Sequence, residues 1–114
     1  MQITRIKDAK PYEAAKHYGM EALRLQGLEA SDLQSFSCNL SYFQPGGGAE
    51  RSRSANEKVY VVLEGEITII TDTSEETLGA LDSCVIGVNE FRVVENRSNS
   101  VCKMLVIISK NMEA

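Results

Sequence analysis

The chain has 114 residues, 43% of them hydrophobic, which suffices for one domain with one small core. Its formal net charge is −4 and its basic residues are scattered, so we expect no nucleic-acid partner. No apolar run is long enough to span a bilayer, and no apolar core follows the basic N-terminal residues. We therefore expect a cytoplasmic protein that does not bind membranes.

The N-terminal third gives mixed signals for secondary structure. Ile3–Arg5 is compatible with a strand, and Pro11–Tyr18 begins with proline and contains two alanines, which favours a short helical turn. Met20–Gln26 fits either the helical or the strand period, and the glycines on both sides of it favour a strand. We interpret residues 1–30 as an N-terminal arm that packs on the rest of the domain or on a partner.

Residues 31–114 contain short alternating or β-branched runs separated by turn residues. The runs are Phe36–Phe43, Lys58–Leu63, Glu66–Asp72, Cys84–Val88, Phe91–Glu95 and Val101–Ser109. Such spacing predicts an all-β sandwich or a closed barrel. Gly65 is expected to adopt a positive φ in a hairpin between two of these runs. Thr71–Glu76 and Asn96–Ser100 are predicted to be solvated loops.

Three cysteines, Cys38, Cys84 and Cys102, fall inside the predicted strands. Their odd number and lack of paired spacing argue against a disulfide framework. We interpret them as small buried hydrophobic residues. A redox or metal-binding role is the alternative.

The segment Pro45–Glu66 resembles the first motif of the cupin superfamily, G-x5-H-x-H-x3,4-E-x6-G, when Gly46 and Gly65 are aligned with its glycines. Gly79–Asn96 resembles the second motif, G-D-x4-P-x-G-x2-H-x3-N. The resemblance covers roughly residues 36–108 and implies a double-stranded β-helix, or jelly-roll, barrel in residues 31–114. The whole chain would then be a single all-β domain.

The positions at which cupins bind a metal carry other residues here. They are Ser52, Ser54, Lys58 and Arg92. Serine hydroxyls are poor ligands for transition metals, and protonated lysine and arginine repel a cation. A one-residue shift of the first motif would substitute Arg51 and Arg53, which are no better, and the single histidine, His17, lies outside both motifs. We expect no metal and no cofactor.

The resemblance implies that these four side chains face one cavity at the barrel mouth. Arg92 offers a planar fork and Lys58 a point charge for a carboxylate or phosphate, and the two serines add hydrogen bonds. The alternative is an internal ion pair, because Glu50, Glu57 and Glu90 are near in sequence.

Aromatic residues could form walls of the same cavity. By the two-residue strand period, Tyr60 and Val62 share the face of Lys58, and Phe36, Cys38, Leu40 and Tyr42 share one face of the preceding strand. Tyr42 and Tyr60 are therefore candidate ligand-binding residues. Plain core packing is the alternative.

The favoured function is metal-independent binding of a small anionic organic molecule, such as a carboxylate, by an accessory or sensing module. One alternative is an isomerase, epimerase or decarboxylase type of enzyme in which Glu50 or Lys58 transfers a proton. Another is an interaction subunit with a filled barrel. The resemblance supplies none of these functions by itself.

The last run predicts a homodimer. In Val101–Ser109, Met104, Val106 and Ile108 point one way while Leu105 and Ile107 point the other. A barrel buries one face of each strand, so the second apolar row needs a cover. The N-terminal arm of the same chain is the alternative cover.

Overall fold

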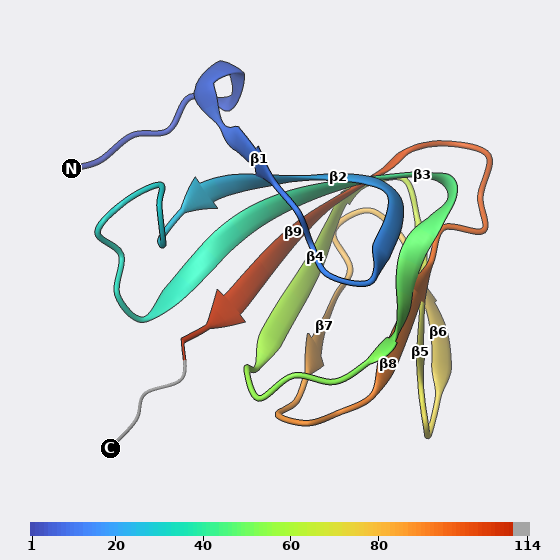
Figure 1. The fold of residues 1–114 in the computed structure, drawn as a ribbon. Helices are drawn as coiled ribbons and strands as arrows, with labels where there is room; N and C mark the ends of the chain where they lie inside the picture. Colours follow the sequence, from blue (N-terminus) through green and yellow to red (C-terminus); the bar gives the residue numbers. More distant parts are fainter. Residues whose placement is uncertain (111–114) are drawn as a thin grey trace.

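The computed structural model describes residues 1–110, and nearly all of the regular structure is β (Figure 1). Its elements are the 3-10 helix η1 (Ile6–Asp8) and the strands β1 (Lys10–Tyr12), β2 (His17–Gln26), β3 (Phe36–Ser52), β4 (Lys58–Glu64), β5 (Ile67–Thr71), β6 (Glu75–Leu78), β7 (Ser83–Ile86), β8 (Arg92–Glu95) and β9 (Cys102–Ser109). Within the described range, no helix has the length and apolarity needed to cross a membrane.

All strand pairs are antiparallel, and the sheet order is β6-β5-β8-β3-β9-β4-β7, with β2 on β3 and β1 on β2. Strand β3 spans both layers, because its first half pairs with β9 and its last residues pair with β8. The sheet therefore curls into a nearly closed antiparallel barrel (Figure 1). The jelly-roll fold predicted from the sequence is confirmed.

Glycines make the bend of β3 possible. A Cβ atom on Gly47 would overlap the carbonyl oxygen of Gly19, and one on Gly48 would overlap that of Val94. The bend thus lets three backbone segments approach more closely than any side chain would allow.

Gly65 has the expected positive φ, +80°. The prediction of a hairpin at this turn is wrong, however. Strand β4 pairs with β7 and β9, whereas β5 pairs with β6 and β8. The turn carries the chain from one layer of the barrel to the other, which a run of alternating residues cannot reveal.

Three local predictions were wrong, and one was confirmed. Ile3–Arg5 is not a strand, and Pro11–Tyr18 holds no helical turn, because Pro11 lies in β1 and the next strand begins at His17. β1 pairs with a single neighbour, which tolerates proline. Of the predicted loop Thr71–Glu76, only residues 72–74 form an exposed turn, because Thr71 ends β5 and Glu75 begins β6, an exposed strand whose polar residues hid its character. The strand at Met20–Gln26 is confirmed as part of β2.

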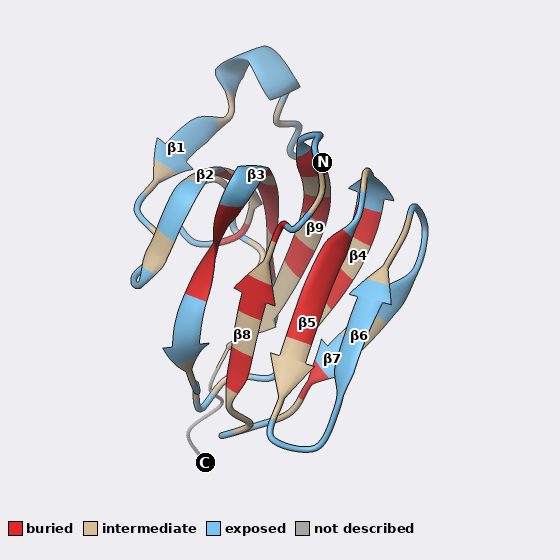
Figure 2. Cartoon of the chain, turned by 90° about the vertical axis from the view of Figure 1, so that its right-hand side faces the viewer, coloured by how far each residue is buried: buried red, intermediate tan, exposed pale blue. Residues whose placement is uncertain are grey.

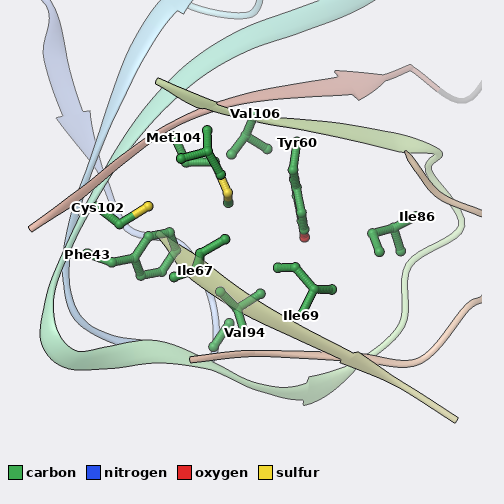
Figure 3. Packing of buried hydrophobic residues seen from close by; sticks show 11 residues of the cluster. Phe43, Tyr60, Ile67, Ile69, Ile86, Val94, Cys102, Met104 and Val106 are labelled. Atoms are coloured by element: carbon green, nitrogen blue, oxygen red, sulfur yellow. The ribbon is translucent and has the colours of Figure 1, made fainter. Parts of the chain in front are cut away.

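The hydrophobic core lies between the two layers of the barrel. Figure 2 shows buried and half-buried positions alternating along β8, and Figure 3 shows the side chains that meet inside. The largest fully buried apolar side chains are Phe43, Ile67, Met104, Val62 and Val94. The three cysteines are free, and Cys102 is fully buried while Cys38 and Cys84 are half-buried. Burial, followed by the charge of Glu66, raises the pKa of the Cys102 thiol to about 11.

Candidate ligand-binding cavity

The barrel contains a cavity of about 490 Å³ that opens to solvent. It extends from the core residues Phe43 and Met104 to Ser109 at the end of β9, and the loop before β2 contributes part of its wall. Its volume lies within the range of about 300 to 1,000 Å³ that is usual for small-molecule sites. The interior is therefore open at the level of the cupin motifs.

A β-bulge in β3 decides which residues face this cavity. Ala49 is opposite Val94 and Ser52 is opposite Arg92, so β3 has one extra residue between these two pairs. The extra residue turns Ser52 inward, next to Arg92, and settles the alternative register that would have placed Arg51 there.

Arg92 is the central cation of the site. Its side chain comes from β8 and the residue is only 4% exposed. Nε donates to the Tyr60 hydroxyl at 2.9 Å, and Nη1 donates to the Glu50 carbonyl oxygen at 3.1 Å and to Ser52 Oγ at 2.8 Å. These bonds use three of the five guanidinium N–H groups. Within residues 1–110, the two on Nη2 have no protein acceptor.

Lys58, at the start of β4, is half-buried and lines the same cavity. Its ammonium group makes neither a hydrogen bond nor a salt bridge with any residue of the described range. Burial lowers the pKa of Lys58, and repulsion by Arg92 lowers it further. The pair therefore forms a cationic centre that no acidic side chain of the described chain neutralises.

The alternative interpretation, an internal ion pair with one of three glutamates, is not found among residues 1–110. The Glu50 side chain is exposed and does not line the cavity; it is the Glu50 backbone carbonyl that meets Arg92. Glu90 Oε1 accepts from the Gly87 backbone N–H at 2.9 Å. Glu57 is exposed, and none of these glutamates forms a salt bridge with Lys58 or Arg92.

The lining as a whole is basic. Among the described residues that surround the cavity, the lysines, arginines and histidine are Lys16, His17, Arg24, Arg53, Lys58, Arg92 and Lys110, against one carboxylate, Glu13. Arg24 is neutralised by Glu29, with Nε 2.9 Å from Oε1. An excess of positive charge remains, which raises the local concentration of anions even though the whole chain is acidic.

His17 lies in the cavity wall, which the sequence did not indicate. It stacks on Phe43 with ring centroids 6.3 Å apart, and its Nδ1 lies 2.8 Å from the Ala15 carbonyl oxygen. Burial lowers the pKa of His17, and Arg92 and Lys58 lower it further against the opposing effect of the Ala15 hydrogen bond. The ring is therefore neutral at pH 7, with Nδ1–H donating to Ala15 and Nε2 left as an acceptor.

Arg24 and Tyr12, from the N-terminal segment, also line the cavity although the sequence did not indicate them. The Arg24 guanidinium lies 3.7 Å above the centre of the Tyr12 ring, and its Nη1 donates to Asn39 Oδ1 at 2.5 Å. Both residues line the cavity. Residues 1–30 thus complete the cavity wall of their own chain through β2, which pairs with β3.

Two of the candidate ligand-binding residues lie outside the cavity. Ser54 Oγ accepts from the Asn56 backbone N–H at 2.9 Å, and Ser54 borders only a small adjoining void of about 10 Å³. Tyr42 is on the opposite face of β3, where its ring packs 5.8 Å from the Lys103 Nζ atom. Tyr60, Ser52, Lys58 and Arg92 do line the cavity.

The residues at the cupin metal positions do not suit a metal. Two of them are cationic, and Ser52 Oγ already accepts from Arg92. Within residues 1–110, no three His, Cys, Asp or Glu side chains come together in a geometry that could hold a metal ion. The residues at these positions therefore do not form a metal site of the usual cupin type.

Fold and motif spacing together define a small cupin whose metal positions have been replaced. The family model described as "Cupin domain" matches residues 39–108, and the chain belongs to this family. A curated relative from Mycobacterium tuberculosis, named beta-D-galactosidase, is 38% identical over 96% of this chain and 94% of its own length.

Solved structures share the fold at low sequence identity. The polyketide cyclase RemF from Streptomyces resistomycificus has a TM-score of 0.84 at 17% identity, over 96% of this chain and 79% of its own. A predicted oxalate decarboxylase from Thermotoga maritima has a TM-score of 0.80 at 20% identity, over 97% of this chain and 100% of its own. These likenesses concern the fold.

Proposed function

We propose that the barrel binds a small organic anion, with the anionic group on Arg92 and Lys58. The observation that carries this proposal is a nearly buried arginine whose hydrogen bonds go to neutral acceptors and whose Nη2 has no protein partner in residues 1–110. Burying a cation is costly unless a counter-charge is present. A carboxylate or phosphate in the cavity supplies that charge.

The geometry favours a ligand with one anionic end. The two N–H groups of Nη2 and the Lys58 ammonium serve one carboxylate or phosphate, as charge-assisted bonds of high strength. Tyr60, Phe43 and Val106 offer apolar surface for the rest of the ligand, whereas Asn56 and Ser41 offer polar atoms. The cavity volume argues against the filled-barrel alternative.

A screen of small anions by thermal unfolding tests this proposal. Ligands present at about 100 times their dissociation constant stabilise the folded state by about 2.7 kcal/mol, which raises the melting temperature by roughly 10 °C for a domain of this size. Arg92→Met should remove the gain, and Arg51→Met, on the outer side of β3 where Arg51 stacks on Phe91, should keep it. No gain from carboxylates and phosphates of varied shape, or an equal gain in Arg92→Met, would refute the proposal.

A second candidate function is that of a carbohydrate-processing enzyme, which the name of the 38% identical relative favours. Glycosidases of the common type need two carboxyl groups across the scissile bond. The described lining offers Glu13 as its carboxylate, and His17 Nε2 as a neutral base. Release of nitrophenol from nitrophenyl β-D-galactoside by the wild type, lost in Glu13→Gln and in His17→Gln, would support this candidate. Absence of turnover would exclude that substrate.

A further inference from the structure

We infer that Lys58 is a nucleophile that forms an imine with a small carbonyl compound carrying a carboxylate or phosphate. This inference rests on the proposed function, because Arg92 would hold the anionic group while the carbonyl carbon meets the lysine. It adds a covalent step to the binding site. A 2-oxo acid or a phosphorylated aldehyde has the required combination of groups.

The position of Lys58 suits this role. It starts β4, which is hydrogen-bonded on both sides, to β7 and to β9, so the backbone under the lysine is held rigidly. The side chain lines the cavity beside Arg92, and its amine is engaged by no hydrogen bond or ion pair within residues 1–110. By contrast, Lys103 is paired with Glu64, with Nζ 3.2 Å from Oε2.

The charge state of Lys58 agrees with the geometry. A lysine attacks carbonyl groups as the neutral amine, and burial beside a second cation is the arrangement that activates lysines for imine formation. Burial and Arg92 both lower the pKa of Lys58. An anionic ligand on Arg92 would offset part of the effect of Arg92 on the pKa of Lys58. The larger effect on this pKa, which comes from burial, would remain.

The step balances without any further reactant. The lone pair of Lys58 Nζ attacks the carbonyl carbon, the C=O π pair moves to oxygen, and a proton passes from nitrogen to that oxygen to give a carbinolamine. Loss of the hydroxyl group as water, with a second proton leaving nitrogen, then forms the C=N bond. His17 Nε2, a neutral acceptor in the same cavity, can carry these protons between nitrogen and oxygen.

Reductive trapping tests the inference. The full chain is incubated with pyruvate or glyoxylate and cyanoborohydride, and the reduced adduct is counted and located by mass spectrometry. We expect one adduct per chain on Lys58, none in Lys58→Arg, and an unchanged yield in Lys7→Arg, which alters an exposed lysine of η1 outside the cavity. Arg92→Met should slow labelling by pyruvate at least tenfold more than labelling by acetone, which lacks the carboxylate but meets the same lysine.

Parallel thermal unfolding with lactate separates the two proposals, because lactate has the carboxylate of pyruvate but no carbonyl group. Stabilisation by lactate without an adduct on Lys58 would overturn the imine and leave the anion site standing. Labelling spread over several lysines, or undiminished in Lys58→Arg, would also overturn the imine. Failure of lactate, pyruvate and other anions to stabilise the protein, together with no adduct, would refute both. A cooperative unfolding transition of each variant without ligand confirms that it folds.

Discussion

Removal of the Tyr60 hydroxyl should measure how strongly the protein depends on the hydrogen bonds that hold Arg92. Tyr60 is 3% exposed and its oxygen accepts from Arg92 Nε at 2.9 Å. Tyr60→Phe keeps the ring and leaves a buried guanidinium N–H without an acceptor. Hydrogen bonds to charged groups contribute about 1.5 to 3 kcal/mol, so we expect a loss of about 2 kcal/mol in the free energy of unfolding.

Urea denaturation is the assay for this change. A loss of about 2 kcal/mol lowers the urea midpoint by about 1 M with an unchanged m value. In an Arg92→Met background, Tyr60→Phe should cost far less, which gives a coupling energy of at least about 1 kcal/mol between the two residues. Anion binding should survive in Tyr60→Phe, because Nη2 is untouched. Stability within about 0.5 kcal/mol of the wild type would refute the described hydrogen bond.

Three further predictions concern the fold, the cavity wall and the assembly. Gly48→Ala should destabilise the protein by about 3 kcal/mol or prevent folding, because its Cβ would overlap the Val94 carbonyl oxygen. A melting temperature equal to that of the wild type would contradict this. The pKa of His17 in the folded state is below its ordinary 6.5, so the unfolded chain takes up a proton first and stability should fall as the pH drops below about 6.5. His17→Gln should flatten this dependence of stability on pH. An unchanged dependence would contradict a neutral, buried ring. We also expect light scattering to show a homodimer, which Leu105→Asp or Ile107→Asp should dissociate or unfold. A monomer at all concentrations would contradict this prediction.

The barrel was predictable from local patterns, whereas the convergence of part of the site was predictable only from the resemblance to the cupin motifs. Turn glycines and short apolar runs gave most strands, and the motif spacing brought Ser52, Lys58 and Arg92 together. Arg92 pairs with Ser52 across 40 residues of sequence, and only the spacing within the resembling motifs could suggest this. Composition and periodicity alone would have suggested the barrel but not this cluster.

The inner face of β3 could not be predicted, because its polarity is the reverse of the usual pattern. Ser37, Asn39 and Ser41 are buried and face the interior, while Leu40 and Tyr42 face outward. A rule that places apolar residues inside therefore selects the wrong face. The reversal has a physical cause: Ser37 and Ser41 line the cavity, and Asn39 forms hydrogen bonds with Arg24 and with the Val106 carbonyl oxygen.

The contribution of residues 1–30 to the cavity wall also could not be predicted from local sequence patterns. His17, Tyr12 and Arg24 reach the cavity because β2 pairs with β3 and β1 folds back on β2. These are long-range pairings that neither composition nor periodicity specifies. Nothing in the local sequence around His17 indicated that it lines the cavity, so this role became evident only from the structure.

The central claim is that Arg92 receives its counter-charge from a ligand. A crystal structure with the anion that most raises the melting temperature tests this most directly. The account predicts a carboxylate or phosphate oxygen about 2.7 to 2.9 Å from Arg92 Nη2, with the ligand inside the barrel beside Lys58. An anion bound elsewhere, or a carboxylate of the chain itself on Nη2, would contradict it.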